Sequence, residues 1–299
     1  MAESRFALPV MAVYGIAVWI MAGALQQGLF LQLALFVIST VLMMTLNNAN
    51  ALIRIYSRMV SCSFVALTCA APFLFSSLES SVTQTCLILF YLSILRSYQD
   101  KKAPGIVFYS FLCLGIASLF FVQTLYFVPF LWIMMASNMM AMTHRMFWAS
   151  VIGLATPYWL AAGYYAYTEQ LPLLLDHFTE LAIFAPLSGY ELPDTPRIAT
   201  FALVAVLTAI GIIHYMRNSY LDKIRTRMIF EMFITMDILA LIFIVLQPQH
   251  FDVLLPLITI NTSCLFAHYV ALTRTRLTNI TFIIVCLATA ALTIYNLTL

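Results

Sequence analysis

The residue with the clearest chemical potential is an acid inside an apolar segment. Asp237 lies near the middle of the apolar run 228–246, where a carboxyl group costs at least about 2.5 kcal/mol to insert into a bilayer. A group kept at that cost is expected to carry a proton or cation, or to contact a polar substrate. The alternative is structural, with a protonated or paired carboxyl holding two helices together.

Further polar residues lie in the same run and in its sequence neighbours. They are Glu231, His214, Asn261 and His268. If these runs pack side by side, the two histidines and Glu231 approach one membrane face, while Asp237 and Asn261 lie deeper, as in a polar path opening to the cytoplasm. Alternatively, the histidines only reach headgroups or loop backbone. No local metal-ligand spacing occurs, so we expect no metal and no cofactor.

A second group of candidate residues lies in the long connection 168–197. Its first half, from Leu171 to Phe184, is amphipathic and predicts a short helix at the outer membrane–water boundary. The candidate acid–base residues of this connection are Asp176, His177, Glu180 and Asp194. The alternative is a solvated lid with no chemistry of its own.

A third group is cationic and is expected on the inner side. It consists of Arg54, Arg58, Arg96, Lys101 and Lys102. Arg54 and Arg58 are four residues apart and could contact an anionic headgroup or phosphate together. Cytoplasmic loops of membrane proteins retain cations in any case, which is the simpler explanation.

The composition requires lipid as the solvent for most of the chain. Of 299 residues, 63% are hydrophobic and only 9% are charged, whereas a soluble domain is roughly a quarter charged. The net charge of +2 and the absence of a basic, aromatic-rich run argue against nucleic-acid binding. The six cysteines form no C-x-x-C pair and are interpreted as apolar fillers.

Eleven apolar runs predict an all-α, polytopic transmembrane bundle that forms a single domain over 1–299. The predicted spans are 7–25, 28–45, 59–77, 80–96, 105–122, 124–142, 146–166, 198–216, 228–246, 253–272 and 277–298. All of the 14 Lys and Arg residues except Arg197 fall on alternate connections. Because cytoplasmic connections retain these cations, we expect the N-terminus inside and the C-terminus outside.

Two short motifs carry a family resemblance. The segment Arg145-Met-Phe-Trp148, followed by Thr156-Pro157-Tyr158, and the segment Phe266-Ala-His-Tyr269 resemble an uncharacterised family of multi-pass inner-membrane proteins from Bacteroidota. The resemblance implies a bacterial inner-membrane location and carries over no catalytic residue.

Three functions are consistent with these features. The first is transport or lipid handling in the cell envelope, with Asp237 as the coupling residue and a lipid or small molecule as substrate. The second is a non-enzymatic assembly subunit with a membrane-protein partner. The third is a membrane glycosyltransferase or polymerase that uses polyprenyl-linked sugars. No catalytic motif is present, which favours the two non-enzymatic functions.

Overall fold

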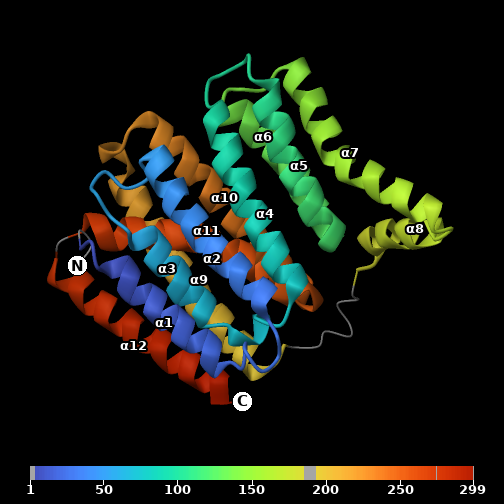
Figure 1. The fold of residues 1–299 in the computed structure, drawn as a ribbon. Helices are drawn as coiled ribbons and strands as arrows, with labels where there is room; N and C mark the ends of the chain where they lie inside the picture. Colours follow the sequence, from blue (N-terminus) through green and yellow to red (C-terminus); the bar gives the residue numbers. More distant parts are fainter. Residues whose placement is uncertain (1–3, 185–192, 274, 299) are drawn as a thin grey trace. The chain divides into compact units, whose positions relative to one another are not determined.

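The computed structural model describes residues 4–184, 193–273 and 275–298, and every regular element within them is a helix (Figure 1). This confirms the predicted all-helical fold for the described residues. The α-helices are α1 (Ala7–Met21), α2 (Phe30–Asn50), α3 (Met59–Cys69), α4 (Leu78–Ile94), α5 (Pro104–Phe120), α6 (Val128–Ser137), α7 (His144–Tyr167), α8 (Leu171–Thr179), α9 (Thr195–Asn218), α10 (Ile224–Leu246), α11 (Phe251–Leu272) and α12 (Arg276–Thr298).

Short 3-10 helices extend or connect several of these elements. They cover Pro72–Leu74, Leu95–Ser97, Val122–Phe127, Glu180–Ala182, Ser219–Leu221 and Pro248–His250. Prolines at the first turns of α5, α6, α8 and α9 favour helix initiation there, because proline lacks an N–H that the first turn would leave unpaired.

Six helical segments are long and apolar enough to cross a membrane. They are Phe30–Asn50, Leu78–Ser97, Thr195–Leu221, Ile224–Leu246, Pro248–Leu272 and Arg276–Thr298. Shorter apolar helices occupy Ala7–Met21, Met59–Cys69, Pro104–Phe120 and Val122–Ser137. The segments support a membrane protein, and each of the eleven predicted runs contains a helix. The number of crossings and their direction stay predictions.

The chain forms two compact units. The first contains 1–81 and 191–299, and the second contains 82–190. The helix α4 begins in the first unit and continues in the second. Whether the two units behave as the single predicted domain over 1–299 is not tested by this division, and the single domain stays a prediction.

The first unit is built around α11, which packs on α3, α9 and α10. Within the most apolar stretch of this helix, 94% of the residues are buried inside the protein. The helix nevertheless carries a run of polar residues, Thr259, Asn261, Thr262, Ser263 and His268, and all of them are buried. Polar groups on so enclosed a helix must find partners on its neighbours.

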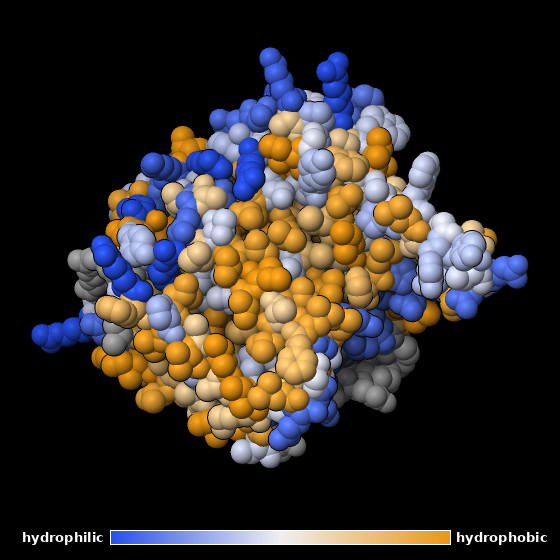
Figure 2. Space-filling view, viewed as in Figure 1, coloured by the Kyte–Doolittle hydropathy of each residue, from blue (hydrophilic) through white to orange (hydrophobic). Residues whose placement is uncertain are grey.

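The outer helices of this unit present apolar side chains outward. Only 17% of the residues in the most apolar stretch of α12 are buried, and Ile280, Ile284 and Leu287 are more than half exposed. Figure 2 shows such hydrophobic side chains in orange, spread widely over the drawn face. An apolar surface of this extent is typical of contact with lipid or with another membrane helix.

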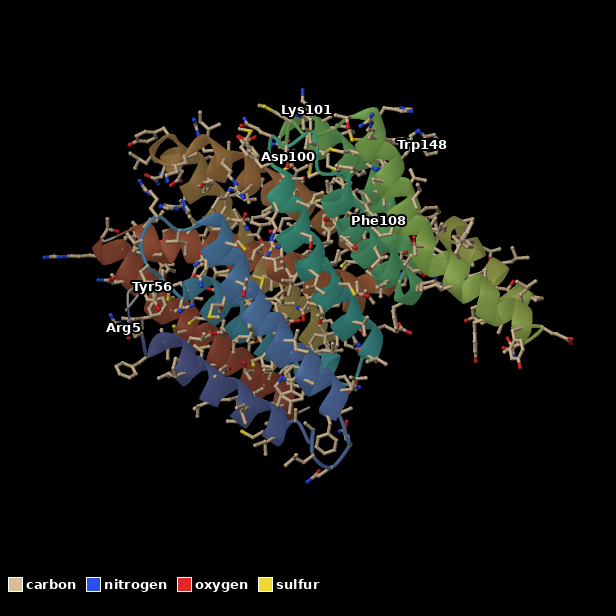
Figure 3. All side chains as sticks on the ribbon, turned by 45° about the horizontal axis from the view of Figure 1, so that its top comes forward. Arg5, Tyr56, Asp100, Lys101, Phe108 and Trp148 are labelled. Atoms are coloured by element: carbon tan, nitrogen blue, oxygen red, sulfur yellow. The ribbon has the colours of Figure 1, made fainter. Side chains whose placement is uncertain are left out.

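In the second unit, α5 and α7 approach closely through glycines. A Cβ atom on Gly153 would lie 2.4 Å from the carbonyl oxygen of Phe108, and one on Gly115 would lie 2.7 Å from that of Leu154. Phe108, labelled in Figure 3, lies in the N-terminal part of α5. Small residues at such contacts let helix backbones pack together in a membrane, where no hydrophobic force drives them.

Candidate functional site

Asp237 lies in the interior of the first unit and is completely buried. It is presented by α10 to α9 and α11, and each of these helices supplies a hydroxyl. The Thr262 hydroxyl donates to Asp237 Oδ2 over 3.1 Å, and Thr208 Oγ1 lies 3.3 Å from the same oxygen. The two hydroxyl oxygens are 2.6 Å apart. Together with Asn261, these residues form what we call the Asp237 layer.

The three oxygens of this layer make three mutual contacts, but the two hydroxyls supply only two hydrogens. A closed ring of hydrogen bonds therefore needs a third hydrogen, which a protonated carboxyl would supply. In that ring Asp237 donates to Thr208, Thr208 donates to Thr262, and Thr262 donates back to Asp237. The neutral acid also avoids burying an unpaired charge.

Several atoms of the Asp237 layer have no hydrogen-bond partner. They are the second carboxyl oxygen of Asp237 and both the oxygen and the nitrogen of the Asn261 side-chain amide. Asn261, like Asp237, is completely buried. Buried polar atoms in native proteins are nearly always paired, and those that are not call for an explanation beyond packing.

A second polar cluster lies in the same unit and is centred on Asp222, at the connection between α9 and α10. Its side chain is fully buried between Arg54 Nε, at 3.1 Å, and His268 Nε2, at 2.9 Å. Arg54 also donates to the carbonyl oxygen of Leu221. Because Arg54 comes from the α2–α3 connection and His268 from the end of α11, three elements meet at one end of the unit. We call this the His268 layer.

Aromatic groups surround His268. The ring centroid of Phe230 lies 4.9 Å from that of His268, and those of His214 and Tyr215 lie at 5.5 and 5.7 Å. His214 forms its own hydrogen bond with Thr273, over 2.9 Å. The structure thus brings His214 and His268 together.

Glu231 is exposed on α10, and its charge acts on Tyr215, whose ring lies beside that of His268. Its neighbour Phe230 occupies the place next to His268 instead. Of the predicted group, the two histidines are therefore in ring contact, and Glu231 is linked to them through Tyr215.

The two layers are joined by the same three helices. From Thr208 to Tyr215, from Asp237 to Phe230 and from Asn261 to His268, the spacing is seven residues in each helix. Residues at this spacing lie on one helix face, about 10 Å apart along the axis.

An apolar layer separates them, formed by Gly211, Phe233 and Leu265, all of which are buried. A Cβ atom on Gly211 would lie 2.8 Å from Leu265 Cβ and 3.0 Å from its backbone carbon. The helices α9 and α11 are thus in close contact between the two polar layers.

The opposite end of the first unit carries a fully paired acid. Arg197 binds Asp252 through two hydrogen bonds of 2.7 and 2.8 Å and binds Asp194 through a third of 2.8 Å. Pro256 has no N–H and so cannot donate to the backbone carbonyl of Asp252, four residues earlier in α11. That carbonyl accepts a hydrogen bond from the Ser80 hydroxyl instead, over 2.8 Å. Both carboxyl oxygens of Asp252 are therefore bonded to Arg197.

The candidate residues of the outer connection are divided between the two units. Asp194 belongs to the first unit, where it pairs with Arg197. In the second unit, Asp176 and Glu180 are exposed. The Nε2–H of His177 donates to the carbonyl of Ser118 over 3.0 Å, which attaches α8 to the end of α5. A short helix is thus present where the amphipathic pattern predicts one.

The candidate cations are also divided. Arg54 pairs with Asp222, and Arg58 donates to the Tyr56 hydroxyl over 3.0 Å. Figure 3 shows Tyr56 toward the same end of the first unit as Arg5. The side chains of Arg96, Lys101 and Lys102 are exposed in the second unit, where Asp100 caps the backbone N–H of Lys102 at 2.8 Å.

Three residues of these layers, Thr208, Thr262 and Asp222, are not predicted from the sequence. Thr208 and Thr262 carry no signal of their own in the sequence. Asp222 is the one acid between Arg217 and Arg227, and an acid among so many cations could have indicated an internal ion pair. Over the residues that the structure describes, no three His, Cys, Asp or Glu side chains are grouped to hold a metal ion.

Comparison with known proteins adds no assignment to this geometry. The sequence matches no protein-family model, and neither a curated protein nor a solved structure is significantly similar to it.

Proposed function

We propose that this chain is a multi-pass membrane protein that transports or otherwise handles a lipid or small polar substrate, and that a proton at Asp237 is coupled to that work. The observation that carries the proposal is the Asp237 layer, a completely buried acid in which neither the second carboxyl oxygen nor the neighbouring Asn261 amide makes a hydrogen bond of good geometry. A carboxyl that only joined helices would be expected to have its polar neighbours satisfied. Unpaired, buried donors and acceptors suit a site whose partners change during function.

The proposed topology has eleven crossings, with the N-terminus inside and the C-terminus outside, in a bacterial inner membrane. It is supported by the two ends of the first unit. One end holds Arg54 with the α9–α10 connection, and the other holds Arg197 with two acids. This separation follows the alternation of charge expected for cytoplasmic and outer connections.

The test begins with the protein released gently from its own membrane and analysed by native mass spectrometry. We expect a specific lipid or small molecule to be retained. The protein is then placed in vesicles with that molecule and an internal pH dye, and a membrane voltage is imposed. We expect proton movement that depends on the molecule and that Asp237→Asn abolishes. The control is Asp176→Asn, an exposed acid of the second unit.

A stoichiometric partner protein with no retained small molecule and no proton movement would overturn the proposal in favour of an assembly subunit. Sensitivity to alanine at Asp176, Glu180 or Asp194, with full tolerance at Asp237, would instead favour a sugar transferase.

A further inference from the structure

The first unit contains two polar layers, and the proposed function uses only the Asp237 layer. The Asp237 layer is enclosed on all sides, whereas the His268 layer reaches Arg54, whose side chain is 36% exposed. We propose that protons reach and leave Asp237 through His268 and Asp222, and that Gly211, Phe233 and Leu265 form the gate between them. This inference rests on the proposed function, because it supplies the route for the same proton.

The register of the three helices supports one continuous route. The two layers use the same faces of α9, α10 and α11, seven residues apart. A proton leaving Asp237 toward this end must pass between Gly211 and Leu265 and beside Phe233, whose ring centroid is 6.0 Å from that of Phe230. Phe230 in turn contacts His268.

His268 has the hydrogen-bond pattern of a relay. Its Nε2 bonds Asp222, so the Nε2–H form donates to the carboxylate, while its Nδ1 is buried without a partner. An imidazole held in this way accepts a proton at Nδ1 and releases one from Nε2. The charged and titratable groups around it are Asp222, Arg54, His214 and Tyr215.

The transfer balances with water as the only other reactant. Asp237 loses a proton, His268 gains it at Nδ1, and the Nε2 proton passes to the Asp222 carboxylate. Asp222 then releases a proton to water beside Arg54 and is a carboxylate again. His268 is left with its proton on Nδ1, and it returns to the Nε2–H tautomer by giving that proton to water and taking another at Nε2. Uptake is the same sequence in reverse.

The distance between the Asp237 layer and the His268 layer shows why a gate is needed. About 10 Å along the helix axis is too far for direct transfer between Asp237 and His268. The apolar layer must therefore open for water to bridge them. Because Gly211 lets α9 lie against Leu265, the structure corresponds to the closed state of this gate.

The experiment measures how quickly the Asp237 proton exchanges with solvent. In the full-length protein in vesicles, the infrared carbonyl band of protonated Asp237 is assigned as the band that Asp237→Asn removes. Its shift after transfer to heavy water then gives the exchange rate. We expect His268→Gln to slow the exchange by at least about tenfold. We expect Phe233→Ala to accelerate it, because a smaller side chain leaves room for water.

Gly211→Ala provides a second test of the gate with little change in volume. Its Cβ forces α9 away from Leu265 and should also accelerate exchange, whereas Gly163→Ala, with no atom within 4 Å of the new Cβ, should leave the rate unchanged. Size-exclusion profiles and thermal unfolding check that each variant is folded.

The outcomes separate the route from the proposed function. An assigned band that exchanges at the same rate in His268→Gln, Phe233→Ala and Gly211→Ala would overturn the route and leave Asp237 as the proton site. The absence of any band sensitive to Asp237→Asn would overturn the proposed function, and the route with it.

Discussion

The first unit holds two acids in contrasting environments. Asp252 is partly exposed and has both carboxyl oxygens bonded to Arg197. Asp237 is completely buried, with one oxygen bonded to hydroxyls and the other unpaired. A paired acid near the surface stabilises a connection, whereas a buried acid with one oxygen left without a partner has a cost that packing does not offset. The contrast suggests that Asp252 is structural and Asp237 functional.

The largest expected effect on stability comes from breaking the paired acid. Arg197→Ala removes both bonds to Asp252, and we expect a loss of about 2 kcal/mol in the free energy of unfolding, between the values for exposed and buried pairs. Asp194→Asn is the matched control, because that carboxyl is 77% exposed and should matter little. Thermal unfolding in detergent measures both. Equal stability of Arg197→Ala and the parent protein would contradict the structural role of the Arg197–Asp252 pair.

Asp237→Asn should have a smaller effect on stability. If Asp237 is neutral, the amide replaces a group of similar shape that carries no charge, so we expect a change below about 1 kcal/mol. Thermal unfolding in detergent measures this change as well. A loss as large as that of Arg197→Ala would mean that the carboxyl holds the helices together and would favour the structural interpretation.

Thr262→Val tests the hydrogen bond between Thr262 and the Asp237 carboxyl. The substitution keeps the shape but removes a hydroxyl that donates to Asp237, and interhelical hydrogen bonds in membranes are worth about 0.6 kcal/mol on average. A double-mutant cycle with Asp237→Asn isolates the coupling between the two residues. A coupling indistinguishable from zero would show that the ring of three oxygens does not form.

The smallest expected effect is that of salt. Raising ionic strength should lower the stability of the parent protein slightly, because the Arg197 pair is partly exposed and therefore screened. The Arg197→Ala variant should lose most of this dependence, and Asp237→Asn should retain it. Identical salt dependence in all three proteins would contradict the assignment of the screened charge to Arg197.

The sequence is sufficient to predict an all-helical membrane fold and to select Asp237 and Asn261, because apolar runs and an acid within one of them are visible without any contact. It does not predict Thr208 or Thr262 as partners, since that requires the register between three helices. Asp222 is missed for a related reason. In the sequence Asp222 stands among several cations and looks like part of an ordinary charged connection. Only the fold brings it next to His268 and Arg54.

The apolar layer illustrates the same limit. Gly211, Phe233 and Leu265 are ordinary residues for membrane helices, and their separation of two polar layers appears only when α9, α10 and α11 are aligned. A seven-residue spacing from Asp237 to Phe230 and from Asn261 to His268 is present in the sequence, but it has meaning only once those helices are known to share an interface.

The most direct test of the central claim is infrared spectroscopy of the carboxyl carbonyl region, comparing the parent protein with Asp237→Asn in vesicles. We expect a protonated-carboxyl band at neutral pH that disappears in Asp237→Asn and that shifts in heavy water. A band that never shifts, or identical spectra for the two proteins, would contradict the claim that Asp237 carries an exchangeable proton.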